Sequence, residues 1–339
     1  MKAFEIGAQN GLSSLTAVTR PDPVPGPGEA VLRVRYVCLN HRDMLVLEGR
    51  YGARRDERRI PVSEGIGEVA AIGAGVTGVK PGDRAIFAHF VQWLDGDFFM
   101  GAFTQDLGIT HDGWLAEYIK VPAAALIKVP DSVTDEQAAP LASAGLTAWH
   151  AVVEVGKVKA GDVVLALGTG GVSIAALQIA KANGARVAIT SSSDDKLALA
   201  KTLGADITIN YRTNPDWSSE LLRQTGGVGA DIIVETGGQA TLTQSFTAAA
   251  TSARIVIIGA LAGSAGDAFP NFSSIIGKNL LVKGIAEGSR AMLARLLRAV
   301  EVNRITPVID RIFPFDEAPA AYAYLKSGAH VGKILVKLD

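Results

Sequence analysis

Cysteine is nearly absent from the sequence: Cys38 is the only one among 339 residues. A single cysteine cannot form an intramolecular disulfide, and it excludes a zinc site built mainly from cysteines. A lone thiol is compatible with a reducing compartment. We therefore expect a cytoplasmic protein.

The sequence also lacks an excess of charge of either sign and a long hydrophobic run. Lys and Arg number 33 against 34 Asp and Glu, which gives a formal net charge of −1, whereas nucleic-acid-binding proteins usually carry a basic excess. The first residues include Glu5 and have no continuous apolar core, unlike a signal peptide. Because no stretch of about 18 uncharged apolar residues occurs, we expect neither a nucleic acid nor a membrane as partner.

What the sequence does contain is enough apolar material for about two domains, at 48% hydrophobic residues. Residues 1–128 hold short strand-like runs separated by Gly- and Pro-containing turns, which predicts a β-rich domain. Across residues 129–289 buried-type strands alternate with helices, which predicts a doubly wound α/β domain with a parallel sheet. The last part, about 290–339, holds a helix and two strands that could complete the first domain.

The strongest local signal is a glycine-rich turn between the apolar strand Val163–Leu167 and a helix with one apolar face. Glycines there allow a tight turn and a close approach of the backbone to a pyrophosphate, which the start of the helix would bind through free N–H groups. Ser173 replaces the third glycine of the usual pattern, and a turn that binds nothing is the alternative. The residues expected to contact a dinucleotide here are Gly168, Thr169, Gly170, Gly171 and Val172.

The end of the second predicted strand indicates which dinucleotide is bound. NAD enzymes usually place Asp or Glu there, but this stretch is Thr190–Ser193, with no acid before Asp194. Serine hydroxyls can donate to a phosphate, so we expect NADP(H) in preference to NAD(H); a polar loop and helix cap is the alternative. The further residues in the expected cofactor site are Ser191, Ser192, Lys196, Tyr211 and Gly259.

Several blocks of the sequence, in order, resemble the medium-chain dehydrogenase/reductase superfamily. They are LNHRDMLVLEGRYG, PVSEGIGEVAAIGAGVTGVKPGDRA, GWLAEYIKVP, PLASAGLTAWHAV and HVGKILVKL. The sequence is most similar to the zinc-independent quinone-oxidoreductase-like and zinc-type alcohol dehydrogenase-like branches. The resemblance implies a discontinuous GroES-like substrate domain around a central Rossmann domain, with the active site in the cleft between them. It also implies a homodimer formed through an exposed sheet edge near residues 280–285, and a place for Thr147 close to the nicotinamide or its phosphates.

The resemblance departs from the zinc alcohol dehydrogenases at the metal. Their catalytic zinc is held by Cys, His and Cys, and the matching positions here are Asn40, Ser63 and Ser143. None of these is a good zinc ligand, because Zn²⁺ prefers thiolate, imidazole or carboxylate. The cysteines of the structural zinc lobe are also missing. We expect no zinc, although the neighbouring Glu64, His41 and Asp43 leave an improvised site open.

Hydride transfer without a metal requires hydrogen-bond donors aimed at the oxygen on which negative charge develops. Asn40 stands at a metal position and could donate through its amide, or it could serve as a helix N-cap. Asp43 lies three residues later on the same helix face and is more suited to anchoring structure than to proton transfer. Tyr51 matches a tyrosine near the substrate cleft of quinone-oxidoreductase-like relatives, and a packing role is its alternative.

Together these features predict a zinc-independent, NADP(H)-dependent oxidoreductase acting on a small carbonyl, alcohol, enone or quinone. The sequence does not separate C=C from C=O reduction. The alternative is a catalytically silent dinucleotide-binding protein with a sensing or structural role, because a fold can outlive its chemistry.

Overall fold

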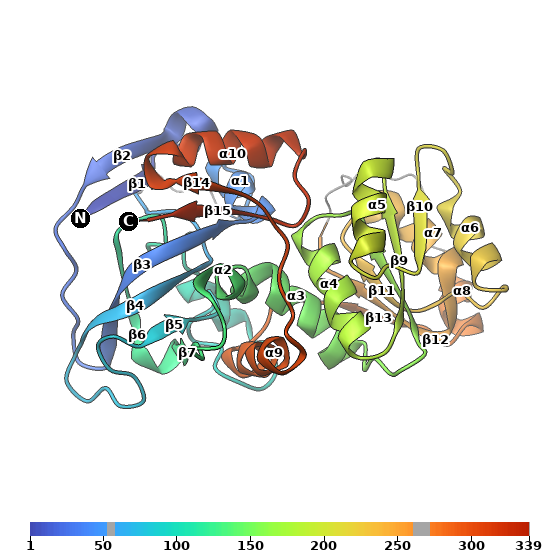
Figure 1. The fold of residues 1–339 in the computed structure, drawn as a ribbon, viewed down its shortest axis with the longest axis horizontal. Helices are drawn as coiled ribbons and strands as arrows, with labels where there is room; N and C mark the ends of the chain where they lie inside the picture. The colour runs from blue at the N-terminus through green and yellow to red at the C-terminus, as the bar shows by residue number, and fades with distance from the viewer. Residues whose placement is uncertain (53–57, 260–271, 339) are drawn as a thin grey trace. The chain divides into compact units, whose positions relative to one another are not determined.

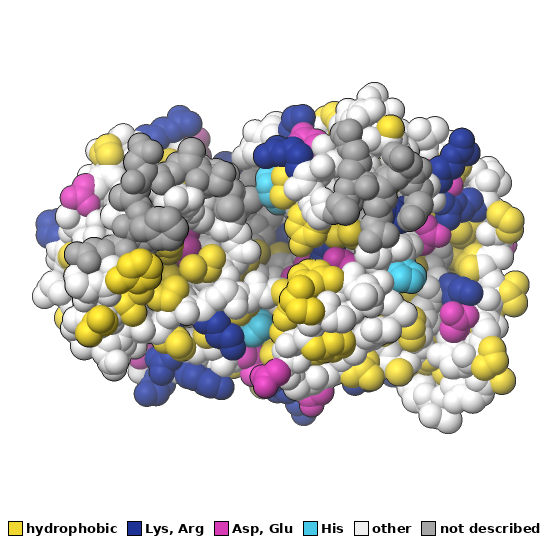
Figure 2. Space-filling view, turned by 180° about the vertical axis from the view of Figure 1, so that it is seen from behind, with side chains coloured by type: hydrophobic (Ala, Val, Ile, Leu, Met, Phe, Trp, Pro, Cys, Tyr) yellow, Lys and Arg dark blue, Asp and Glu magenta, His cyan; other side chains and the backbone are white. Residues whose placement is uncertain are grey.

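The computed structural model describes residues 1–52, 58–259 and 272–338 (Figure 1). The chain divides into two compact units, Met1–Leu146 with Gly288–Asp339, and Thr147–Glu287. We call them the first and second unit. No helix in the described part of the chain is long and apolar enough to cross a membrane. On the face drawn in Figure 2, Lys and Arg side chains are scattered among acidic and apolar ones, in keeping with the near-zero net charge.

The first unit is built on a seven-stranded, mostly antiparallel sheet. Its main path runs β14 (Ile309–Pro314), β15 (Lys333–Lys337), β3 (Glu29–Leu39), β4 (Gly65–Ile72), β5 (Arg84–Ile86) and β7 (Ile127–Lys128), while β6 (Tyr118–Pro122) pairs with β3. A separate antiparallel pair joins β1 (Lys2–Ile6) to β2 (Leu15–Thr19). The C-terminal strand β15 lies against β3, with Ile334 opposite Leu39. This register brings the start of β15 next to the end of β3, about 300 residues earlier in the chain.

The described helices of this unit are α1 (His41–Leu47), α2 (Asp135–Ala138), α9 (Arg290–Asn303) and α10 (Ala318–Ser327). α10 packs on β3, β14 and β15 and α2 packs on β3 and β4, whereas α1 packs on α10 and α9 on the segment Leu141–Gly145. The predicted helix after Ser289 is α9: the Ser289 hydroxyl accepts from the Met292 N–H, and Leu293, Leu296 and Leu297 are buried. Full burial of one such leucine contributes about 1.5–3 kcal/mol. The 3-10 turns of this unit are Leu12–Ser14, Met100–Gln105, Ala123–Ala125 and Phe315–Glu317.

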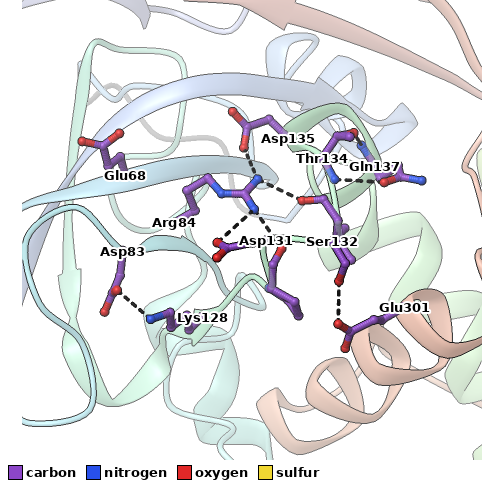
Figure 3. A network of polar contacts seen from close by, with 12 residues as sticks. Glu68, Asp83, Arg84, Lys128, Asp131, Ser132, Thr134, Asp135, Gln137 and Glu301 are labelled. Atoms are coloured by element: carbon purple, nitrogen blue, oxygen red, sulfur yellow. Dashed lines mark hydrogen bonds and ion pairs between the residues drawn. The ribbon is translucent and has the colours of Figure 1, made fainter.

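The first unit extends beyond the predicted boundary at residue 128 because side chains of its sheet hold the following segment. Arg84 donates to Val133 O, Pro130 O and Asp135 Oδ1 at 2.8–2.9 Å. The Tyr36 hydroxyl donates to Glu136 Oε1 at 2.5 Å. Figure 3 shows the Arg84 guanidinium directed into this segment. A boundary argued from local pattern alone does not register these long-range contacts.

The second unit is a six-stranded parallel sheet, as the alternating pattern predicts. Its order is β10 (Ile207–Asn210), β9 (Arg186–Ser191), β8 (Val163–Leu167), β11 (Ala230–Glu235), β12 (Ala249–Ile257) and β13 (Leu281–Gly284). Numbered from β8, this is the 3-2-1-4-5-6 order of a Rossmann fold, and every residue of β8 is buried. The expected α/β fold class is confirmed, and the strand order reverses between β8 and β11.

Helices connect the parallel strands of the second unit and pack on its sheet. They are α4 (Gly171–Ala182), α5 (Asp194–Thr202), α6 (Trp217–Gln224), α7 (Gln239–Ala248) and α8 (Phe272–Gly277). α4 packs on β8 and β9, and α5 on β9 and β10, whereas α7 packs on β11 and β12. Since parallel crossovers are right-handed, connections running in opposite directions from the switch point place their helices on opposite faces. A helical stretch leads into this unit as Leu141–Gly145, α3 (Leu146–Trp149) and His150–Val155.

Candidate active site

The glycine turn of the second unit leaves the start of α4 open. Gly168 follows β8 with φ of 78°, a left-handed conformation that favours glycine, and its N–H donates to Thr190 Oγ1 at 3.2 Å. Gly170 is the N-cap of α4 and makes no side-chain capping bond. A Cβ added at either glycine would meet nothing within 4 Å. No side chain caps α4, and no atom crowds these two glycines, so the N–H groups that the first turn of a helix leaves without intrahelical acceptors are not covered by a capping side chain, as an anion site requires.

Small hydroxyl residues close the floor of this turn. Ser173, in the place of the third glycine, is buried and donates its hydroxyl to Leu167 O at 2.6 Å. Thr236, which follows β11, donates to the same carbonyl at 3.0 Å. A Cβ at Gly259 would lie 3.3 Å from Thr236 O, so the carboxyl ends of β8, β11 and β12 meet here. Of the other expected cofactor residues, Thr147 and Thr169 are buried and Val172 is half-buried.

The end of β9 carries hydroxyls where an NAD enzyme usually has an acid. Ser191 is the last residue of β9, and its hydroxyl accepts from the Ser193 N–H at 3.3 Å. Ser193 caps α5 by accepting from the Lys196 N–H, which is the alternative role considered for this stretch. Tyr211 is 42% exposed, and its N–H donates to Ser191 O. Ser191, Ser192, Lys196 and Tyr211 thus gather at one corner of the sheet.

The first acid after β9 is engaged elsewhere. Asp194 Oδ1 accepts from Asn210 Nδ2 at 2.7 Å, so this carboxylate is held against β10. Asp194 is also in the first turn of α5, where a negative charge favours the helix dipole. Its position has a structural explanation that does not involve a ribose.

Glu235 was not predicted as a site residue, yet it shapes the loop at the switch point. The carboxylate is fully buried at the end of β11, and its Oε1 accepts from Gly237 N, Gly238 N and Thr241 Oγ1 at 2.6–3.0 Å. Ser245 Oγ donates to the other oxygen. The signal in the sequence was an acid ending an apolar strand directly before Thr-Gly-Gly. These four donors hold the Glu235 carboxylate, which fixes the loop that follows β11, and β11 is the neighbour of β8 and its glycine turn.

In the first unit, Asn40 lies in a buried polar network at the start of α1. Its backbone N–H donates to Asp43 Oδ2 at 2.8 Å, so the two residues form the helix cap. Its amide Nδ2 donates to Glu64 Oε2 at 2.8 Å and to Cys38 O at 3.3 Å. Its Oδ1 accepts from Lys333 Nζ. Both amide hydrogens therefore have protein acceptors, and the bond to Cys38 O is the longer and weaker one.

Lys333, at the start of β15, is the second functional residue that the sequence reading missed. Its buried ammonium donates to Leu39 O at 2.9 Å, to Asn40 Oδ1 and to Glu64 Oε2 at 3.1 Å. Burial lowers the pKa of this group, but the neighbouring Glu64 and Asp43 carboxylates favour its charged form, and the pKa is raised to about 12. The lysine is therefore charged. Its signal was a basic residue placed directly before the three apolar residues of the terminal strand, Ile334, Leu335 and Val336.

The positions that match zinc ligands in relatives converge on the same network. Ser143 donates its backbone N–H to Glu64 Oε1 at 2.6 Å, and Ser63 Oγ lies 3.4 Å from Asp43 Oδ1. Glu64 is fully buried. Asn40, Ser63 and Ser143, the three positions that match zinc ligands, thus lie around the carboxylates of Glu64 and Asp43.

Asp43 titrates in an unusual range. Burial raises its pKa to about 6, although Arg42, the Asn40 N–H and Lys333 act in the opposite direction. The buried Tyr322 hydroxyl of α10 has no hydrogen-bond partner among the described residues, and burial together with Asp43 raises its pKa well above the usual range. A proton on Asp43 is therefore in exchange near neutral pH.

These residues do not fit a zinc ion. Burial raises the pKa of the Cys38 thiol well above its usual value, whereas zinc requires the thiolate. The Glu64 carboxylate already accepts from an ammonium, an amide and a backbone N–H. Within the part of the chain that the structure describes, no three His, Cys, Asp or Glu side chains are grouped to hold a metal.

Tyr51 is not part of the Asn40–Glu64–Lys333 network. Its ring lies beside the guanidinium of Arg42, a residue of α1. The Arg42 guanidinium is 5.2 Å from the centre of the Tyr51 ring and is ion-paired to Asp106 at 2.7 Å. Tyr51 is half-buried against the core of the first unit. This arrangement is compatible with the packing role as well as with a phenol that donates to a substrate, so the donor role stays a prediction.

Comparison with known proteins accords with both units. Residues 26–131 match the alcohol dehydrogenase GroES-like domain family, and residues 171–301 match the zinc-binding dehydrogenase family. The chain is 40% identical over 319 residues to a zinc-type alcohol dehydrogenase-like protein of Schizosaccharomyces pombe, covering 92% of each chain.

Two solved structures are similar over the full length of both chains. One is an NAD-dependent alcohol dehydrogenase, with 34% identity and a TM-score of 0.90. The other is a mycobacterial protein in complex with NADPH, with 26% identity and a TM-score of 0.82. These neighbours differ in the dinucleotide named for them, so the choice of cofactor must be argued from the residues of this chain.

Proposed function

The chain belongs to the medium-chain dehydrogenase/reductase superfamily as an alcohol dehydrogenase-like oxidoreductase, and we propose that it transfers hydride between NADP(H) and a small carbonyl, alcohol, enone or quinone without zinc. The observation that carries this proposal is the open, uncapped start of α4 behind Gly168 and Gly170. When bound there, the dinucleotide supplies or accepts the hydride. Thr169, Gly170, Gly171 and Val172 would hold its pyrophosphate by backbone N–H groups, and Gly168, whose N–H is bonded to Thr190, would shape the turn.

The preference for NADP(H) is supported by the end of β9. Ser191 and Ser192 can donate to a 2′-phosphate, and the nearest acid, Asp194, is bonded to Asn210. Introducing an acid at the strand end should reverse the preference, because a carboxylate repels the phosphate. We expect Ser191→Asp to raise the KM for NADPH at least about tenfold and to leave the KM for NADH within about threefold. Equal changes in both KM values would contradict the assignment.

Zinc independence is supported by the identity of the residues at the three metal positions. A serine hydroxyl and a carboxamide are poor zinc donors, and the remaining acids are engaged with Lys333 and Asn40. Purified protein with turnover should therefore contain far less than one zinc per chain and should keep its activity in a chelator. Activity that is lost with EDTA and restored by zinc would refute this part of the proposal.

In the absence of zinc, hydrogen-bond donors of the first unit would stabilise the negative charge that develops on the substrate oxygen. The Asn40 amide hydrogen now weakly bound to Cys38 O, and the Tyr51 hydroxyl, are the donors we assign to the substrate oxygen. Removing one donor to a developing oxyanion typically costs about 10²–10³ in kcat. The test is oxidation of NADPH and NADH with a panel of aldehydes, enones and quinones, repeated with Asn40→Ala and Tyr51→Phe. If neither variant slows turnover by about tenfold, these donor assignments are wrong.

The second candidate is a dinucleotide-binding protein without catalysis. The engagement of both Asn40 amide hydrogens by protein acceptors is the observation that favours it. Tight NADPH binding combined with no turnover on any member of the panel would support this candidate. Turnover with any substrate class excludes it.

We also propose a homodimer formed through the edge strand β13. This strand is hydrogen-bonded to β12 alone among the described strands, and Leu281 on it is 47% exposed. The adjacent helix α8 exposes Phe272 and Ile276. An apolar sheet edge of this kind commonly pairs with a second copy. Leu281→Lys should shift the mass measured by light scattering from dimer to monomer, and an unchanged dimer would argue for another interface.

A further inference from the structure

Lys333 places a permanent positive charge among the residues that stand at zinc-ligand positions. Its ammonium contacts Asn40 directly, and it shares Glu64 with the backbone of Ser143. The side chain is 7% exposed and that of Glu64 is fully buried. A cation so deeply buried is retained only when it is well compensated.

All three hydrogens of this ammonium are used within the protein. The acceptors are Leu39 O, Asn40 Oδ1 and Glu64 Oε2, and a lysine has three donors. Lys333 therefore cannot donate to a substrate without breaking one of these bonds. Any contribution to the reaction must come through its charge and through the groups that it holds.

We propose that Lys333 is a positioning residue of this oxidoreductase, whose buried ammonium takes the place of a metal cation and fixes which side of the Asn40 amide is free to donate. This inference rests on the proposed function of the same site. Because an ammonium has no acceptor, it selects Oδ1 of Asn40 and turns Nδ2 away from itself. The Nδ2 hydrogen that is bonded to Cys38 O at 3.3 Å is then the one for which a substrate oxygen can compete.

The charge has a second effect on the same oxygen. Negative charge that develops during hydride transfer is stabilised by fixed positive charge in a site of low dielectric constant. An unpaired Glu64 carboxylate would repel the negative charge that develops on the substrate oxygen. The salt bridge to Lys333 at 3.1 Å offsets this repulsion. Lys333 thus cancels the charge of one of the two carboxylates of this network, that of Glu64.

A purely structural salt bridge makes a different prediction, and paired substitutions separate the two. Lys333→Met leaves the Glu64 carboxylate buried without its cation, whereas Lys333→Met combined with Glu64→Gln removes both charges of the salt bridge and leaves neither partner unpaired. The readouts are the thermal midpoint, the Kd for NADPH, and kcat and KM measured separately on the best substrate of the panel. Lys337→Met is the matched control, because Lys337 lies on the same strand and is exposed.

We expect the double variant to recover most of the thermal midpoint and to bind NADPH within about threefold of wild type. Its kcat should remain about 10²-fold lower, the usual effect of losing oxyanion stabilisation. Lys337→Met should change none of these values. A double variant with wild-type kcat would show that Lys333 only compensates Glu64, and the inference would fall.

A second comparison decides the matter if the double variant does not fold. Lys333→Arg and Lys333→Gln are compared at a temperature at which both bind NADPH. The arginine variant, which keeps the cation, should have at least about tenfold higher kcat than the glutamine variant, and equal values contradict the inference. Wild-type protein without turnover on any substrate would remove the proposed function itself, whereas an active wild type with an equally active double variant removes only this inference.

Discussion

The cofactor turn of the second unit and the Asn40–Glu64–Lys333 network of the first unit are built on opposite principles. The turn uses backbone N–H groups and small residues within a few positions of one another, from Leu167 to Ser173. The network uses charged side chains from three segments, with Lys333 separated by 293 residues from Asn40 and by 269 from Glu64. A backbone site tolerates side-chain changes that leave its conformation intact, whereas a buried charge network fails when one member is lost.

The largest effect should come from breaking the network at its centre. Glu64→Ala leaves the Lys333 ammonium buried and unpaired, so we expect a loss of about 3–5 kcal/mol in the free energy of unfolding. Urea denaturation measures this value. Glu68→Ala, on the strand β4 that begins directly after Glu64, is the control, because Glu68 pairs with the exposed Arg33 and Arg35 and should cost less than about 1 kcal/mol. Similar losses in the two variants would mean that the buried network contributes no more to the free energy of unfolding than an exposed ion pair does.

The pH dependence of stability should report on Asp43. Its folded pKa of about 6 lies above the ordinary value of 3.8, so the folded state binds the proton more tightly than the unfolded state. Stability from this group is therefore lost as pH rises between about 4 and 6, and the loss reaches about 3 kcal/mol above pH 6. The charged groups that act on Asp43 are Arg42, Lys333 and Glu64.

Asp43→Asn tests this expectation, because an amide oxygen can still accept from the Asn40 N–H but does not titrate. The difference in unfolding free energy between wild type and Asp43→Asn should shift by about 2 kcal/mol, against the wild type, from pH 4 to pH 7. Other titrating groups are common to both proteins and cancel. A difference that does not change with pH would place the pKa of Asp43 near its ordinary value.

A smaller and more selective effect should come from the glycine turn. Gly168→Ala forces a side chain into the left-handed region, with an expected cost of about 1–2 kcal/mol in stability. Gly170 has φ of −77°, so Gly170→Ala introduces no left-handed strain and should cost at most about 1 kcal/mol, since alanine is less favoured than glycine at an N-cap. Its methyl group would nevertheless stand where the pyrophosphate must approach, and we expect the Kd for NADPH to rise about tenfold. Calorimetric titration measures that Kd, and unchanged binding in both variants would mean that the dinucleotide does not bind at this turn.

The same contrast explains what sequence reasoning could reach. Strands, helices and the glycine turn depend on short-range patterns, and β8, the turn and α4 lie where the pattern predicts them. Asn40 was predicted either as a donor or as a helix cap, and it is the first residue before α1 with its N–H bonded to Asp43. Its substrate contact stays a prediction.

Lys333 and Glu235 could not be assigned because their roles depend on pairings between distant strands. A lysine that opens β15 becomes a site residue only through the register that sets Ile334 opposite Leu39. Glu235 gains its role from the switch between β8 and β11, which the order of strands along the chain does not specify. The first segment of the first unit runs past residue 128, the boundary expected from the sequence, for the same reason. Arg84 and Tyr36, which are distant in the chain, bind residues 130–136.

The placement of β15 beside β3 also sets an order of events during synthesis. Asn40 and Glu64 leave the ribosome long before Lys333. Until β15 is synthesised, the nascent first unit must therefore either bury the Glu64 carboxylate without its cation or leave it hydrated and its surroundings unfolded. The second unit has all of its own strands by then and can fold earlier. The second unit with its glycine turn should therefore fold before the Asn40–Glu64–Lys333 network is complete, and a chain shortened before residue 333 should retain the fold of the second unit better than that network.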